Sequence, residues 1–170
     1  MAKRTLKMKM IRDFDKFKAS WEKTADDPGM CAFHYMIALL NVEEDYQRAC
    51  AMVSIMVHKR YTKEDLMSPS GLGLWGNHLN FVNHIKYNPN TPKSYVGGVP
   101  EKAYELEGDD LTLTVLKVET KGKNCTVYLY SSGRDRPASG SMEKNKHGQW
   151  KLTGTSTWIM SVMPPIDDDF

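Results

Sequence analysis

The side-chain pattern of this chain changes its period near the middle, and this change limits the folds that it can form. Up to about residue 87, apolar residues recur every three or four positions, which is the spacing of one helix face. From about residue 111, apolar and polar residues alternate, as they do in strands with one buried face. Between these regions, residues 88–92 read NPNTP, and neither proline can donate a helical hydrogen bond. The boundary between a helical part and a β part is therefore expected here.

The helical part predicts about four helices. Asp13, Asp27 and Asn41 each precede an apolar stripe at helical spacing, so each of these side chains is a candidate N-cap. Pro28 directly follows Asp27, which is typical of the first turn of a helix. A fourth helix is expected from about Leu74 to Lys86.

The β part predicts an antiparallel sheet. Residues 111–116 and 125–130 alternate in polarity, and a hairpin turn is expected between them at 121–124. A second turn at 145–148 leads into another strand, and a last strand is expected from about Ser156 to Met163. Because short turns join antiparallel strands, we expect an α+β fold. In this fold the N-terminal helices pack on a C-terminal sheet of four or five antiparallel strands.

The charges near the two ends define the outer segments of this organisation. The first twelve residues contain five cations and no acid, whereas three consecutive aspartates stand near the other end. We expect one compact domain with five segments: a basic flexible tail (1–12), a helical part (13–87), an irregular connection (88–110), an antiparallel β part (111–165) and an acidic tail (166–170). The net charge of +2 is nearly neutral, so we interpret the basic tail as a solubilising terminus. In the alternative reading, this tail binds the phosphates of a nucleic acid, and removing residues 1–12 would abolish that binding.

The cysteines and the hydropathy pattern predict a cytoplasmic protein. Cys31, Cys50 and Cys125 are odd in number, far apart and without the spacing of a metal site. All three lie in apolar patterns, so we interpret them as small core residues. The charged N-terminus is not followed by the run of roughly seven apolar residues that a secretory signal needs. No apolar run approaches the roughly eighteen residues of a membrane span, so no membrane contact is expected.

The sequence predicts neither a catalytic site nor a metal or cofactor site. The five histidines lack the i, i+4 spacing of paired metal ligands on a helix, and no Cys/His cage is present. Residues 71–76 read GLGLWG and match a GxGxxG pattern. A dinucleotide site needs a strand directly before this pattern, whereas here a Ser-Pro loop precedes it. We therefore expect no catalytic residues, no metal and no cofactor.

The turn that contains Arg134, Asp135 and Arg136 is the first candidate binding site. Two guanidinium groups on one turn, flanked by hydroxyl side chains, can hold a carboxylate or a phosphate through paired hydrogen bonds. In the alternative reading, Asp135 pairs with a neighbouring arginine or with the backbone and only shapes the turn.

Aromatic residues on the neighbouring strands are the second candidate. Tyr128, Tyr130 and Trp150 would form an aromatic binding platform if they shared one exposed face of the sheet. The alternative reading is that they pack in the core.

Four motifs occur in a fixed order in the second half of the chain. They read SYVGGVPEKAY at 94–104, SSGRDRPAS at 131–139, GQWKL at 148–152 and TSTWIMSVMPP at 155–165. This succession resembles the signature of a family of uncharacterised bacterial proteins, a domain of unknown function. The resemblance implies a cytoplasmic bacterial protein without agreed catalytic residues. Helices followed by a curved antiparallel sheet are also similar to the cone-shaped folds of the nuclear-transport-factor-two class, which includes both enzymes and binding modules.

Two functions follow as hypotheses. The first is a non-enzymatic accessory or protein-interaction domain that contacts a protein partner through the Arg134–Arg136 turn and the aromatic strands. The second is a small-molecule-binding or enzymatic cone-shaped fold. Its pocket would lie between helices and sheet and be lined by Tyr128, Tyr130, Trp150 and a histidine. A pocket of several hundred cubic ångströms with convergent polar groups would favour the second hypothesis.

Overall fold

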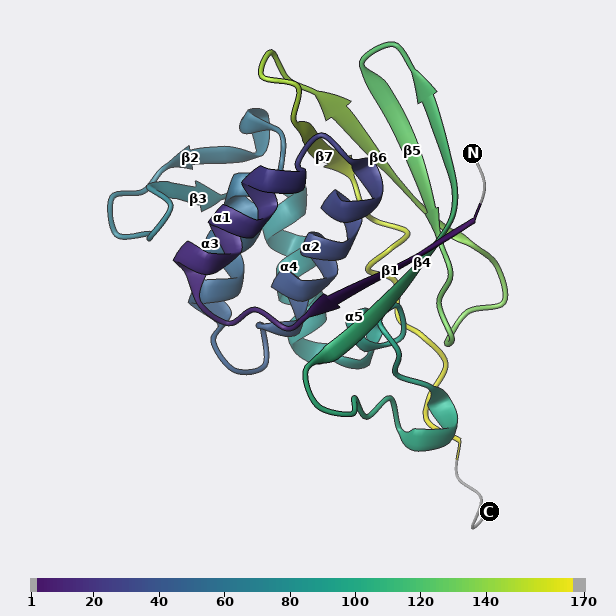
Figure 1. Ribbon diagram of the computed structural model, residues 1–170. Helices are drawn as coiled ribbons and strands as arrows, with labels where there is room; N and C mark the ends of the chain where they lie inside the picture. Colours follow the sequence, from purple (N-terminus) through teal and green to yellow (C-terminus); the bar gives the residue numbers. More distant parts are fainter. Residues whose placement is uncertain (1–2, 167–170) are drawn as a thin grey trace.

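The computed structural model describes residues 3–166 and places the helices on one side of a five-stranded antiparallel sheet (Figure 1). The helices are α1 (Phe14–Thr24), α2 (Pro28–Leu40), α3 (Tyr46–Met56), α4 (Asn77–Tyr87) and α5 (Asn90–Lys93), with the 3-10 helices η1 (Lys59–Tyr61) and η2 (Pro100–Lys102). The sheet has the order β1 (Arg4–Lys9), β4 (Asp110–Lys121), β5 (Asn124–Leu129), β6 (Ala138–Lys144) and β7 (Trp150–Gly154). A separate hairpin consists of β2 (Thr62–Glu64) and β3 (Leu72–Leu74). The predicted α+β class and antiparallel sheet are confirmed.

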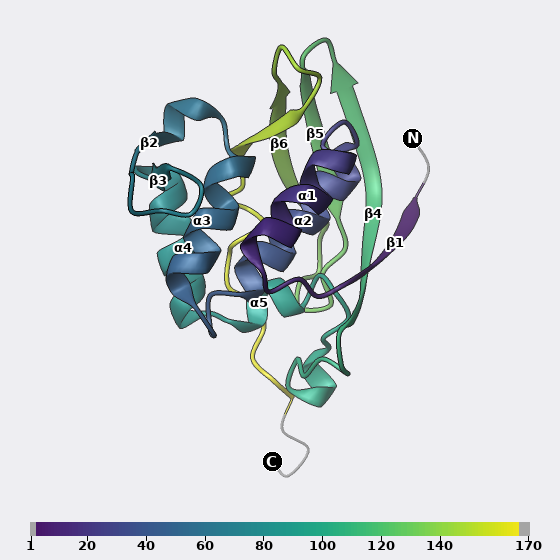
Figure 2. The same ribbon diagram turned by 60° about the vertical axis from the view of Figure 1, so that its left-hand side comes forward.

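The helices cover one face of the sheet and leave the other face uncovered, as Figure 2 shows with the sheet nearly edge-on. On the covered face, Leu113 and Val127 are fully buried, and so are Phe33 and Ile37 of α2. The space between the helices and the sheet is thus filled by side chains. Within residues 3–166, no helix has the length and the apolar character needed to cross a membrane.

The N-terminal segment is a strand and not the flexible tail that we expected for residues 1–12. Arg4–Lys9 form β1, which pairs antiparallel with β4 at one edge of the sheet. Leu6 and Met8 pack against the core, whereas the residues beside them point to solvent. Arg4 also makes an ion pair of 2.9 Å with Asp27 at the start of α2. The prediction was wrong because it relied on the high content of cations and overlooked the alternation of apolar and polar side chains. In addition, the strand that pairs with this segment lies more than a hundred residues away in the sequence.

The C-terminal segment corrects a second prediction. Residues 156–163, which we expected to form a strand, contain turns and irregular backbone. Trp158 and its neighbour Ile159 are both buried, which a strand with one solvent face does not allow. The indole Nε1 of Trp158 donates a hydrogen bond of 3.0 Å to the carbonyl oxygen of Ala138 in β6. Of the acidic tail expected at 166–170, all but Ile166 lies outside the described residues.

The start of α3 is the third correction. Asp45, and not Asn41, caps α3, because its carboxylate accepts a hydrogen bond from the backbone N–H of Arg48. Asn41 instead ends α2, and its side-chain amide donates to the carbonyl oxygens of Ile37 (2.8 Å) and Ile11 (3.0 Å). The other predicted caps are confirmed, since Asp13 and Asp27 accept backbone hydrogen bonds at the starts of α1 and α2. The predicted hairpin turns at 121–124 and 145–148 are confirmed as well.

Candidate functional site

The Arg134–Arg136 turn does not present its two guanidinium groups in the same way. The guanidinium of Arg134 donates a hydrogen bond to the carbonyl oxygen of Thr157, so this arginine fastens the C-terminal segment. Asp135 and Arg136 are exposed. The turn therefore offers Arg136 to a ligand, while Arg134 is engaged in a contact within the chain.

The three aromatic residues do not form one platform. Tyr128 and Tyr130 alternate with buried residues of β5 and lie on the uncovered face of the sheet, where 52% of Tyr130 is exposed. The Nζ atom of Lys117 lies 5.7 Å from the ring centre of Tyr128. Trp150, in contrast, is only 4% exposed and belongs to the core. Two of the three predicted aromatic residues are thus available on the surface.

A groove of about 600 Å³ lies between the segment that follows α3 and the hairpin that joins β6 to β7, near the upper end of the molecule in Figure 1. Its lining combines apolar, basic and amide side chains. The lining residues are Ser54, Val57, His58, Lys59, Thr62, Leu72, Glu143, Lys144, Asn145, Lys146, His147 and Lys151.

Hydrogen bonds fix both walls of this groove. Where α3 ends, Val57 forms an isolated parallel bridge with Leu152 of β7, and the N–H of His58 donates to the carbonyl oxygen of Leu152 at 2.9 Å. On the opposite wall, the side-chain oxygen of Asn145 accepts hydrogen bonds from the N–H groups of His147 (2.9 Å) and Gln149 (3.0 Å). The chain after α3 is therefore held beside β7, and the hairpin tip is folded into a defined loop.

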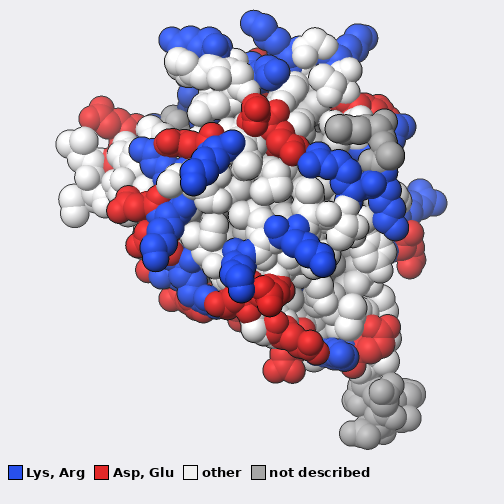
Figure 3. Space-filling model, viewed as in Figure 1, with Lys and Arg blue, Asp and Glu red and all other residues white. Residues whose placement is uncertain are grey.

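The groove carries an excess of positive charge. Four lysines line it, namely Lys59, Lys144, Lys146 and Lys151, against one carboxylate. That carboxylate, Glu143, lies 4.0 Å from His58 and 3.9 Å from Arg60. Among the described residues, none of the four lysines forms a salt bridge. Figure 3 shows lysine and arginine side chains gathered at this end of the molecule, over the hairpin tips.

Lys151 differs from the other lysines of the groove in its surroundings. Its Nζ atom donates a hydrogen bond of 2.5 Å to the carbonyl oxygen of Ile55 and lies 4.7 Å from the ring centre of Trp21. Burial lowers the pKa of the Lys151 amine, because a charged ammonium loses hydration there. Lys59, Lys144 and Lys146 are exposed.

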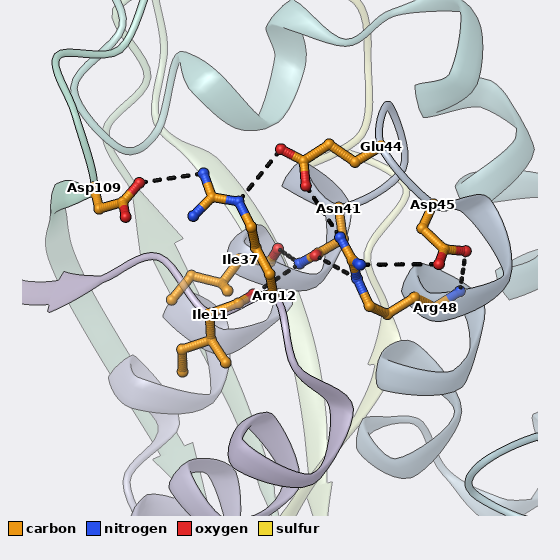
Figure 4. Close-up of polar contacts among 8 residues, drawn as sticks. All are labelled: Ile11, Arg12, Ile37, Asn41, Glu44, Asp45, Arg48 and Asp109. Atoms are coloured by element: carbon orange, nitrogen blue, oxygen red, sulfur yellow. Dashed lines mark hydrogen bonds and ion pairs between the residues drawn. The ribbon is translucent and has the colours of Figure 1, made fainter.

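A second group of charged residues is self-contained and serves the fold. The Arg12 guanidinium bridges Glu44 (3.3 Å) and Asp109 (3.2 Å), as Figure 4 shows. Arg48 donates to Asn41 at 3.0 Å and to Glu44 at 3.1 Å. Each charge in this network has a partner of opposite sign, which ties the segment after β1 to α2, α3 and the start of β4. The contrast with the unpaired lysines makes the groove the better candidate for a ligand site.

The sequence did not predict the groove. The residue types at 145–148 predict only a turn, and residues 58–60 do not indicate a site by themselves. Two short basic runs, HKR at 58–60 and KNKH at 144–147, were the available signal. Nothing local in the sequence shows that these runs face each other across one groove. No group of three metal-ligating side chains occurs within residues 3–166.

Comparisons with known proteins give one match. The model of a family described as a domain of unknown function (DUF6935) matches residues 9–166. No curated protein and no solved structure matches the chain.

Proposed function

This chain belongs to the DUF6935 family of domains of unknown function, and we propose that it is a non-enzymatic binding module for a small anionic molecule. The ligand would occupy the groove between the segment after α3 and the β6–β7 hairpin. We place this role in the bacterial cytoplasm, in line with the sequence resemblance.

One observation carries this proposal: four lysines line a single groove, and none of them has a carboxylate partner within residues 3–166. Ammonium groups that share a groove repel one another, and an anion between them turns this repulsion into attraction. Lysine binds phosphate as a compact point charge, and a groove of about 600 Å³ is in the usual size range of small-molecule sites. A small organic phosphate, with up to two negative charges per phosphate group, fits this balance of charges.

A binding role also agrees with how the walls are built. His58 and the hairpin tip are held by hydrogen bonds of the backbone, so the groove is preformed and little ordering is needed when a ligand binds. Contact with a protein partner through Arg136 and the exposed tyrosines on the uncovered sheet face stays a prediction, and it involves a different surface.

Isothermal titration calorimetry with pyrophosphate tests the proposal. The wild-type chain is compared with the double variant Lys144→Gln/Lys146→Gln, which removes two charges from the groove. The matched control is Lys16→Gln/Lys18→Gln, which removes two exposed charges from the start of α1. We expect the groove variant to bind about tenfold more weakly or worse, because each lost contact with a charged group costs roughly 1 kcal/mol. Equal weakening in the two variants, or no binding by the wild type, would overturn the proposal.

A further inference from the structure

Lys151 is the groove lysine with a defined and partly enclosed position. It extends from β7 toward the ends of α1 and α3, where its Nζ atom lies between the carbonyl oxygen of Ile55 and the ring of Trp21. Among the described residues no carboxylate pairs with this amine. Its positive charge is therefore supported by a carbonyl dipole and an aromatic face, and by nothing of full opposite charge.

These surroundings favour the neutral amine more than a solvated surface does. Removal from water penalises the ammonium form, and burial accordingly lowers the pKa of Lys151. The neutral form of a lysine amine is a nucleophile, because its nitrogen has a free electron pair. Lys151 is also one of the residues that line the groove, together with Lys59, Lys144 and Lys146.

We propose that Lys151 captures a small organic phosphate that carries an aldehyde or ketone group, by forming a reversible imine with its carbonyl carbon. This inference rests on the proposed function, since the basic groove supplies the attraction for the phosphate. It adds the identity of the second functional group on the ligand and the residue that engages it.

The reaction balances without an oxidant or a reductant. The electron pair of the Lys151 Nζ atom attacks the carbonyl carbon, and the carbonyl oxygen takes up a proton that leaves the nitrogen. The resulting hydroxyl group departs as water with a second proton from the nitrogen, and a carbon–nitrogen double bond forms. When the imine nitrogen takes up a proton from solvent, the N–H bond that it gains can donate to the Ile55 carbonyl oxygen, and the positive charge stays near the Trp21 ring. The contacts that now hold the ammonium group thus suit the product as well.

Pyridoxal 5′-phosphate is the probe for this inference. The full chain is incubated with the probe, the imine is reduced with borohydride, and the labelled lysines are located by peptide mass spectrometry. We expect Lys151 to be labelled several-fold more than the exposed control residues Lys16 and Lys18. Inorganic phosphate should compete with this labelling, and pyridoxal without the phosphate group should label Lys151 less.

The outcomes separate this inference from the proposed function. If pyrophosphate binds in the groove but Lys151 is labelled no more than Lys16, the imine inference fails and the proposed function stands. If Lys151 is labelled equally by both forms of pyridoxal and pyrophosphate does not bind, the amine is reactive but the groove is no phosphate site. Lys151→Arg keeps the charge and should retain pyrophosphate binding while losing the label. If this variant does not fold, the peptide map of the wild type decides alone.

Discussion

Trp158 lies directly against Gly140, and a Cβ atom at position 140 would overlap the indole ring. Gly140 belongs to β6 and Trp158 to the irregular segment that follows β7, so this contact fixes the C-terminal segment on the covered face of the sheet. The indole also donates its N–H to Ala138 of the same strand.

Gly140→Ala should therefore destabilise the fold. An extra methyl group in a filled core typically costs about 1–3 kcal/mol, and the rigid indole cannot yield as a flexible side chain could. Gly154→Ala is the matched control, because its Cβ would meet the Oγ atom of Ser141, which can rotate away. Chemical denaturation followed by circular dichroism measures both variants. Equal free energies of unfolding for the two variants would contradict this account of the contact.

His78 should make the fold sensitive to mild acid. Burial lowers its pKa from 6.5 to about 4, with a smaller effect of Arg60 in the same direction and an opposing hydrogen bond to the carbonyl oxygen of Thr153. The unfolded chain binds a proton at His78 more readily than the folded chain does. The contribution of neutral His78 to the free energy of unfolding is therefore fully present above about pH 6.5. It decreases as the pH falls toward 4, by on the order of 2 kcal/mol.

Denaturation midpoints between pH 7 and pH 4.5, a window taken from the His78 pKa values, check this expectation. His78→Gln keeps a side chain that can donate to Thr153 but has no proton to gain. Its stability should change less with pH than that of the wild type. An identical pH dependence in both proteins would show that another group is responsible.

The ion pair between Arg4 and Asp27 should contribute stability that is lost in stronger acid. Burial alone would raise the pKa of Asp27. The hydrogen bond and the charge of Arg4 lower this pKa, and so do hydrogen bonds from the backbone N–H groups of Gly29 and Met30, so that the net effect is a lowering. The pKa is consequently held below its ordinary value of 3.8. The stabilising effect is complete above that value and disappears as the pH falls through the lower pKa of the folded state.

Arg4→Gln tests this pair without removing the N-cap of α2. The variant should be less stable than the wild type at neutral pH, and the difference should shrink as the pH falls from 3.8 through the lower pKa of Asp27 in the folded state. Thermal unfolding over this range gives the comparison. A difference that does not depend on pH would mean that Arg4 acts through packing alone.

The three cysteines should differ in their reactivity. Burial raises the pKa of Cys31 and of Cys125 to about 12, so both remain thiols at neutral pH. Cys50 is only half-buried and lines a groove beside the β2–β3 hairpin, although burial raises its pKa as well. Timed labelling of the native chain with iodoacetamide should modify Cys50 first, and all three should react in denaturant. Early modification of Cys31 in the native chain would contradict its place in the core.

Local patterns were sufficient to predict the elements whose partners are close in sequence. Leu111, Leu113 and Val115 alternate into the core as expected, and Asp13 and Asp27 cap helices because their hydrogen bonds are made within one turn. The predictions that failed concern segments whose contacts are made with residues far away in the sequence. The strand at Arg4–Lys9 forms because it pairs with β4. Residues 156–163 are irregular and not a strand, and Trp158 in this segment packs on Gly140 of β6.

The same limit applies to the candidate site. The basic groove depends on the bridge between Val57 and Leu152, which brings together two runs that carry no signal of belonging to one site. The Arg134–Arg136 turn and the two tyrosines could be predicted as candidate binding residues from their residue types and their positions near turns. Whether a side chain is free or already engaged, as Arg134 is by Thr157, depends on contacts across the fold that a linear pattern does not contain.

The pairing of β1 with β4 also has a consequence for how the chain is made. A ribosome that has just released Arg4–Lys9 has not yet translated Asp110–Lys121, so β1 lacks its pairing partner while the residues between the two strands are made. Leu6 and Met8 have no sheet partner during that interval, and the charges of Lys7 and Lys9 beside them oppose association with other nascent chains. The edge strand of the sheet is thus synthesised well before the strand that it pairs with.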